Sequence, residues 1–289
     1  MQLPMVFLDG PWRMAMGLNR LDLADWLWFD SHAEAEIAEK RRLLALHPEA
    51  VLAGLPDAGP AARELLDMIC GHLVRHHPGR AVDVPAVEGV VEPLRAAGLL
   101  VQEDLCLMAP GADGYTLAAA FLAFPSRWRL HEKLGRPLRA IHAPVPGFAE
   151  RLAAPAERLF DTLVVERPVW RANWSLHDDP ALFQPWGRER EPHLDAADAG
   201  LHLWLRVERQ TLRRLPASGH VVFTIRTLVR PLAEVAALPQ VAAAMAARIR
   251  EMPAAVLGYK AMLAVREPIL GWLDGMAGDG PQQQPQALG

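Results

Sequence analysis

Apolar and polar residues recur along the first third of the chain with the period of an amphipathic helix. The segment from Asp30 to Leu46 opens with acidic residues, carries three basic residues later and stops before His47-Pro48, the charge order that a helix dipole favours. The same period predicts helices over residues 59–76 and 86–97, although Pro93 interrupts the last of these. We therefore expect residues 1–98 to form a helical N-terminal region.

The period changes to two in residues 99–230, as in half-buried strands. Two strands are expected in residues 99–110 and 115–125, joined by a Gly-Ala-Asp-Gly turn. Prolines and glycines between residues 126 and 146 predict short helices and turns, and one longer helix follows near residues 147–164. Three more strands are predicted by the alternation, and these are Val169–Leu176, Leu201–Leu212 and His220–Leu228.

This element order predicts an α+β fold whose centre is PAS-like, meaning a five-stranded antiparallel sheet with helices over one face. Residues 99–230 would form that core. Residues 231–275 return to alanine-rich helical sequence, and residues 276–289 are rich in glutamine, glycine and proline, so we expect a disordered tail there.

Composition narrows the possible classes of protein. The 289 residues include 51% hydrophobic residues, enough for a substantial core, and the net charge of −4 predicts neither a nucleic-acid partner nor docking on an anionic membrane. No segment reaches the roughly 18 apolar residues of a membrane span, and the first residues lack a signal-peptide pattern, so we expect a cytoplasmic protein. The two cysteines, Cys70 and Cys106, are too few for a disulfide framework, a four-thiolate zinc site or an iron–sulfur cluster.

Charged and polar side chains alternate with apolar ones along the strand Leu201–Leu212. Leucines and a valine at 201, 203, 205 and 207 would face the core, and the opposite face would carry His202, Trp204, Arg206, Glu208 and Gln210. Arg226 of the next strand could lie beside this row. The row is either a solvated surface or a polarised pocket in which the arginines and the amide donate hydrogen bonds to bound dioxygen and Glu208 holds a small cationic substrate.

The histidines give two kinds of candidate. His142 lies in Ile-His-Ala-Pro-Val-Pro, where apolar neighbours and two prolines favour a rigid iron ligand, although a buried structural histidine is the alternative. His202 would be a distal group near such an iron, and His177 would lie either there or in a loop. His72, His76 and His77 resemble a metal site by spacing, but we interpret them as solvated imidazoles at a helix end.

At these residues the sequence resembles the haem-dependent oxidative N-demethylase family, which includes the α subunit of dimethylamine monooxygenase. The match spans most of the chain. The segments that carry it are Met16-Gly17-Leu18, Trp26, Glu103-Asp104, residues 124–128 (FPSRW), residues 133–135 (KLG), residues 141–146 (IHAPVP), residues 171–174 (RANW), residues 206–216 (RVERQTLRRLP), residues 223–226 (FTIR) and Tyr259-Lys260.

The resemblance implies a histidine-ligated haem b that activates dioxygen and removes a methyl group from a small secondary amine, releasing formaldehyde. It also implies that electrons come from NADPH through separate flavin and iron–sulfur subunits. This agrees with the two cysteines of this chain, which are too few to hold an iron–sulfur cluster. We expect His142 as the iron ligand and His202, Arg171 and Asn173 as further cofactor contacts. We expect Arg206, Glu208, Gln210 and Arg226 as the catalytic group.

Two other classes of function stay open on the sequence. A PAS-like layout also suits a haem-based gas or redox sensor, although no kinase, cyclase or DNA-binding segment accompanies it here. A relative that has lost catalysis, and that acts as an interaction protein with or without haem, is the third class.

Overall fold

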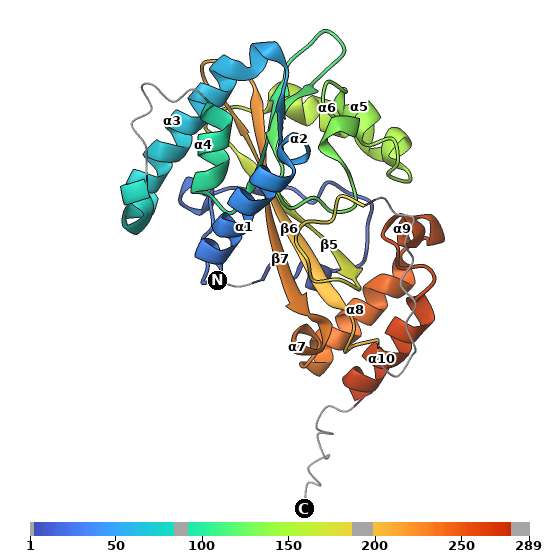
Figure 1. The fold of residues 1–289 in the computed structure, drawn as a ribbon. Coiled ribbons are helices and arrows are strands. Elements are labelled where there is room, and N and C mark those ends of the chain that lie inside the picture. Colours follow the sequence, from blue (N-terminus) through green and yellow to red (C-terminus); the bar gives the residue numbers. More distant parts are fainter. Residues whose placement is uncertain (1–2, 84–91, 187–198, 279–289) are drawn as a thin grey trace, which may run out of the picture.

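An antiparallel sheet of seven strands forms the centre of the computed structural model, which describes residues 3–83, 92–186 and 199–278 (Figure 1). The strand order is β1-β5-β6-β7-β3-β4-β2, and every neighbouring pair is antiparallel. The strands are β1 (Asn19–Arg20), β2 (Leu52–Gly54), β3 (Asp104–Ala109), β4 (Thr116–Phe121), β5 (Val169–His177), β6 (Trp204–Arg214) and β7 (Val221–Pro231).

The predicted α+β class and the five predicted strands are confirmed, because β3 to β7 all occur and lie next to one another in the sheet. The predicted count of five is too small. β1 and β2 come from the region expected to be helical and pair with β5 and β4 at the two edges. Strands of two or three residues are too short to show an alternating pattern, so periodicity does not reveal them.

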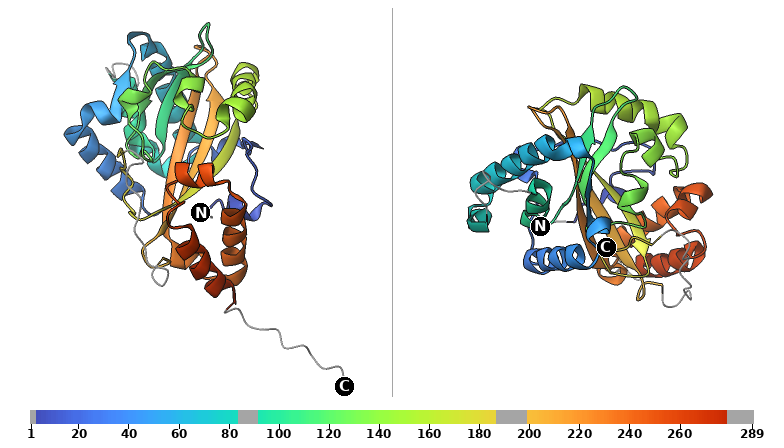
Figure 2. Two further views of the ribbon diagram at one scale, coloured as in Figure 1. Left: turned by 90° about the vertical axis from the view of Figure 1, so that its right-hand side faces the viewer. Right: turned by 45° about the horizontal axis from the view of Figure 1, so that its top comes forward.

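Helices cover both faces of the sheet, and the expectation of one covered face is wrong (Figure 2). On β3, Leu105 and Leu107 point to one face, where they pack with the helices of the N-terminal region. Cys106 and Met108 point to the other face and pack with Phe148 and the helix that follows it. Both faces of β3 are apolar, so its side-chain pattern fits a strand buried on two sides.

The helices follow the sequence expectations closely. They are α1 (Ala33–Leu46), α2 (Pro48–Val51), α3 (Gly59–His76), α4 (Pro93–Leu100), α5 (Leu138–Ile141), α6 (Ala153–Thr162), α7 (Leu232–Val235), α8 (Pro239–Glu251), α9 (Ala254–Tyr259) and α10 (Arg266–Gly278). Pro93 begins α4, where its missing N–H costs nothing, and in the described part of the helix expected at 86–97 the helix continues to Leu100. Residues 84–91 and most of the expected tail, residues 279–289, lie outside the described residues.

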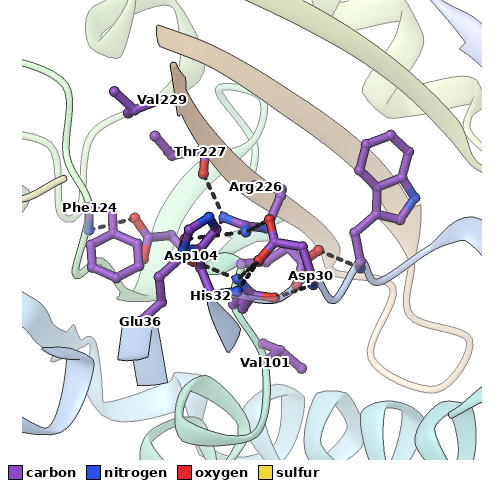
Figure 3. A network of polar contacts seen from close by, with 12 residues as sticks. Asp30, His32, Glu36, Val101, Asp104, Phe124, Arg226, Thr227 and Val229 are labelled. Carbon is purple, nitrogen blue, oxygen red and sulfur yellow. Dashed lines mark hydrogen bonds and ion pairs between the residues drawn. The ribbon is translucent and has the colours of Figure 1, made fainter. Parts of the chain in front are cut away.

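A buried ionic network joins the N-terminal region to the sheet (Figure 3). Arg226 of β7 forms ion pairs at 2.9 Å with Asp30, which precedes α1, and with Glu36 of α1. Gln102 donates hydrogen bonds to both carboxylates. Glu103 accepts a hydrogen bond from the backbone N–H of Trp28 at 2.8 Å. The network therefore fixes α1 and the chain before it against β7 and the start of β3.

Lys40 is, like Arg226, a fully buried cation of this network. Its side chain and that of Asp104 are both fully buried, 3.9 Å apart. The ammonium group donates to the carbonyl oxygens of Gly98, Val101 and Glu103, and Asp104 accepts from two backbone N–H groups at 2.9 Å. Burial lowers the pKa of Lys40 to about 8, partly offset by Asp104. The ammonium therefore stays protonated at neutral pH.

Candidate functional site

A cavity of about 700 Å³ lies beside β5 and β6. This volume falls within the roughly 300–1,000 Å³ that small-molecule and cofactor sites occupy. Its walls come from distant parts of the chain: residues 6–19, the loops and helices between 126 and 160, one face of the sheet, and residues 248–260. Two of the four catalytic candidates, Glu208 and Gln210, line it together with the proposed ligand His142.

Four polar side chains form a compact group on the sheet wall of the cavity. In the register of β5 and β6, Arg171 lies directly opposite Gln210 and Asn173 lies directly opposite Glu208. Directly opposed residues of an antiparallel pair project to the same face, about 5 Å apart. Gln210 donates a hydrogen bond to Glu208 at 3.1 Å. The structure therefore brings together two predicted catalytic residues and two predicted cofactor contacts.

Arg206 lies two residues before Glu208 on β6 and supports this group from outside the cavity. The residue is 1% exposed, and its Nε lies 3.7 Å from a carboxylate oxygen of Glu208. Its terminal nitrogens donate to the carbonyl oxygens of Phe124 at 2.6 Å and Leu182 at 3.2 Å. Burial lowers the pKa of Arg206, and Glu208 opposes that shift. Arg206 orients the Glu208 carboxylate and does not itself line the cavity.

Arg226 lies on the opposite face of the sheet, so the expectation that it stands beside the row is wrong. In the register of β6 and β7 it pairs with Arg209, which projects away from Glu208 and Gln210. Its guanidinium is held by Asp30 and Glu36 in the ionic network described above. Arg226 is therefore a structural residue of that network.

His142 follows α5 and stands in the wall of the cavity. Its ring stacks on Phe148 with 4.7 Å between centroids, and its Nδ1 lies 2.9 Å from the carbonyl oxygen of Leu138. A carbonyl only accepts, so Nδ1 carries the proton and Nε2 keeps its lone pair. In the described parts of the chain no hydrogen bond engages Nε2. Burial lowers the pKa of His142 to about 4, so the ring is neutral at pH 7.

His177 also lines the cavity, but both of its ring nitrogens are engaged. Nδ1 lies 2.8 Å from Gln184 Oε1, and Nε2 lies 2.8 Å from Ser175 Oγ. Burial, with Arg206 as the next cause, lowers its pKa to about 3. His202 is exposed, lies before β6 begins and is not among the residues that line the cavity. His142 is therefore the histidine best suited to hold a metal ion.

The depressed pKa of His177 predicts a loss of stability in mild acid. The folded-state value, about 3, lies below the roughly 6.5 of an unfolded histidine. The contribution of the neutral ring to the free energy of unfolding is therefore fully present above the unfolded-state pKa, and it declines as the pH falls towards the folded-state pKa. We expect this group alone to lower the free energy of unfolding by about 2 kcal/mol between pH 7 and pH 5.

Urea unfolding at the two pH values measures this effect, and His177→Gln is the matched variant because glutamine keeps hydrogen-bonding groups without titrating. The difference between the two pH values should be about 2 kcal/mol smaller in the variant. An equal difference in both proteins would show that His177 is not buried as a neutral ring.

The cluster of His72, His76 and His77 is more buried than expected. His72 is 5% exposed and packs edge-on against Trp26 at 5.3 Å, and its ring lies 4.7 Å from that of His76. The solvated state that we expected is therefore wrong for His72, whose pKa burial lowers to about 3. In the described ranges, no group of three histidine, cysteine or carboxylate residues is arranged to hold a metal ion.

The sequence did not reveal that residues 6–19 form a wall of the cavity. This N-terminal strap is held by a ring contact between Phe7 and Trp174 at 5.4 Å and by a hydrogen bond from Trp12 N to Glu251 at 2.6 Å. Met14 packs so closely on Gly147 that a Cβ there would lie 2.8 Å from its sulfur. The strap has almost no regular structure, so no periodicity marks it; Met16-Gly17-Leu18 in the family resemblance was the available signal.

The residues of the cavity fit a haem group. Apolar side chains of Leu117, Phe148, Leu159 and Phe160 line it, as a porphyrin face requires. His142 donates its Nδ1 proton to the backbone carbonyl of Leu138, and a hydrogen bond of this kind orients metal-binding imidazoles. The Nε of Arg171 is buried with no hydrogen-bond partner among the described residues, as expected for a group that meets an anionic ligand such as a haem carboxylate.

The geometry defines an α+β protein with one large, mostly apolar cavity that holds an oriented histidine and a polar group on the sheet. A family model described as haem-dependent oxidative N-demethylase, alpha subunit-like, matches residues 17–80 and 79–270. The chain belongs to this family. The resemblance inferred from the motifs is thereby confirmed, and the family supports haem dependence and membership of a multi-subunit oxidoreductase. Among the described residues, no helix has both the length and the apolar character needed to cross a bilayer.

Proposed function

We propose that this chain is the oxygenase subunit of a monooxygenase that removes a methyl group oxidatively from a small secondary amine such as dimethylamine. It would use haem b, dioxygen and electrons from separate NADPH-dependent subunits that carry flavin and an iron–sulfur cluster. The observation that carries the proposal is that His142, oriented through its Nδ1, and the Glu208 group line one cavity.

His142 is the residue that would hold the iron. Its Nδ1 proton is fixed on the Leu138 carbonyl and Phe148 stacks on the ring, so the imidazole is oriented before any metal binds. When bound, haem supplies the activation of dioxygen and the oxidation of the substrate C–H bond. Arg171 would pair with a haem carboxylate, and Asn173 would donate a hydrogen bond inside the cavity.

Glu208 would bind the amine. A secondary amine is a cation at neutral pH, and a partly buried carboxylate attracts it strongly because few competing waters are present. Arg206 and Gln210 hold the Glu208 carboxylate in place, at 3.7 Å and 3.1 Å. The same carboxylate can accept the ammonium proton, which frees the nitrogen lone pair that N-demethylation requires.

An absorption spectrum of the purified protein tests the proposal. Protein expressed with added haem precursor should show a Soret band, and dimethylamine should shift that band. With NADPH and a flavin/iron–sulfur reductase, the sample should release formaldehyde. A coloured protein that binds gases without turnover would instead indicate a sensor, and a colourless protein would exclude haem chemistry altogether.

Glu208→Gln isolates the role of the carboxylate. Glutamine has nearly the same shape but no charge, so the variant should keep its Soret band. Its affinity for dimethylamine should fall at least about 10-fold, which corresponds to a loss of about 1.4 kcal/mol in binding free energy. Spectral titration with the amine measures this affinity. An unaltered titration curve would remove Glu208 from the substrate site.

We further propose that residues 99–230 form a PAS-like core. The PAS-like assignment is supported by the chain order of two strands, short helices, one longer helix and three strands. We also propose the division into residues 1–98, 99–230, 231–275 and 276–289, and a cytoplasmic location.

A further inference from the structure

Lys260 reaches from the segment after α9 to the sheet wall of the cavity. Its Nζ donates a hydrogen bond to Asn173 Oδ1 at 3.0 Å and a second one to the carbonyl oxygen of Trp174. The ammonium group also lies 5.9 Å from the centre of the Trp174 ring. Asn173 is one of the four polar residues on the sheet wall, directly opposite Glu208.

The contact with Lys260 decides which way the Asn173 amide faces. An ammonium group has only donors, so it must meet the amide oxygen and not the amide nitrogen. The NH2 group of Asn173 is then turned away from Lys260. In the part of the chain that the structure describes, no hydrogen bond engages this NH2 group, although Asn173 lines the cavity. The amide therefore presents donors to the cavity.

The backbone around Lys260 is strained. In the described ranges, the two non-glycine residues with positive φ are Arg127, at 59°, and Ala261, at 53°. Ala261 follows Lys260 directly, and Arg127 Nη1 donates to the carbonyl oxygen of Lys260 at 3.3 Å. Both strained residues therefore meet at the backbone of one lysine that lines the cavity. Strain of this kind persists where the surrounding structure holds a functional geometry.

We propose that Lys260 is a positioning residue that fixes the Asn173 amide with its NH2 group towards the cavity, where it donates to an electron-rich atom of a small bound ligand beside Glu208. This inference rests on the proposed function, because the ligand meant is one that binds in the haem cavity. With this orientation Asn173 is a donor and Glu208 is an acceptor on neighbouring strands. An anionic or electron-rich ligand would bind beside Asn173, and the cationic amine would bind beside Glu208.

The first test does not need haem. In ¹⁵N-labelled protein as purified, the side-chain amide signal of Asn173 is assigned by its loss in Asn173→Asp. This signal should move in Lys260→Met, which removes the donor, and return towards its original position in Lys260→Arg, which restores one. A signal that stays in place in Lys260→Met would overturn the proposal.

The second test uses the reduced, haem-loaded protein with carbon monoxide as the probe. A donor near bound carbon monoxide lowers its C–O stretching frequency, so Lys260→Met and Asn173→Asp should both raise the frequency, and Lys260→Arg should stay close to the original protein. Asn173→Asp is informative because aspartate still accepts from Lys260 but has no NH2 group.

Lys133→Met is the matched control, because Lys133 also lines the cavity but lies over Trp128, at 4.1 Å from the ring centre. It removes the same charge without touching Asn173. If Lys133→Met raises the C–O frequency as much as Lys260→Met does, the effect is one of general charge and the positioning role is wrong. If the protein binds no haem, the proposed function fails while the amide signal still decides the role of Lys260.

Discussion

The His142→Ala variant should purify without a Soret band even when haem is supplied during expression. Alanine removes the imidazole that lines the cavity and whose Nδ1 contacts Leu138, and it leaves the apolar residues of the wall in place. Loss of a partner that only orients a metal ligand costs roughly 10- to 100-fold in metal affinity, so loss of the ligand itself should cost more. The affinity for haem, measured by Soret titration, should therefore be at least about 100-fold weaker than that of the original protein.

His177→Gln is the control for this experiment, because His177 lines the same cavity but uses both ring nitrogens within the protein. It should keep its haem. Added imidazole should restore part of the Soret band to His142→Ala by filling the space that the side chain leaves. If His142→Ala keeps its haem and spectrum while His177→Gln loses them, His177 is the ligand and the assignment to His142 is wrong.

Lys40→Met should destabilise the fold by about 3–5 kcal/mol, the usual cost of removing one partner of a buried ion pair. Methionine fills much of the space but leaves the fully buried Asp104 without its cation and three carbonyl oxygens without their donor. Urea unfolding at pH 7 measures the loss. Because the network anchors the chain before α1, we also expect the N-terminal region to become more accessible to proteolysis.

Two comparisons make the Lys40 prediction specific. Lys40→Met combined with Asp104→Asn removes both charges, so the pair should be more stable than the sum of the two single changes predicts. Arg42→Met lies two residues away on α1, in an ion pair with Glu39 whose side chains are 57% and 35% exposed, and should leave stability unchanged. If Lys40→Met unfolds at the same urea concentration as Arg42→Met, the buried cation is not needed for stability.

The central strands and main helices were predictable because their signals are local. Gly59–His76 has a helical period with basic residues in its last turn, and β6 alternates over most of its length, so both appear at nearly the predicted residues. Glu208 and Gln210 follow from this alternation on a single strand. His142 followed from its apolar, proline-rich neighbourhood together with the family resemblance.

Arg226 shows where such reasoning stops. Alternation gives the two faces of β7, but only the pairing of β6 with β7 shows which face Arg226 shares with its neighbour. The observed register pairs Arg209 with Arg226, and a shift by one residue would have placed Arg226 beside the Glu208 row. The turn between the strands sets this register, and residue periodicity does not encode it.

The N-terminal strap and Lys260 were missed for a related reason. Both contribute to the cavity through contacts between residues more than 80 positions apart, such as Phe7 with Trp174 and Lys260 with Asn173. Neither has a local pattern of polar and apolar residues that distinguishes it from an ordinary loop. A sequence pattern specifies elements, whereas a cavity is specified by how elements meet.

Because residues 6–19 and 248–260 are both walls of the cavity, the site has an order of assembly. A ribosome that has synthesised β5 and β6 has made the polar wall but not the segment that closes it. The pocket is complete only after residue 260 has emerged and both ends of the chain have packed onto the sheet. We therefore expect the cofactor to be incorporated late, and a chain that stops before α9 should accumulate without its prosthetic group.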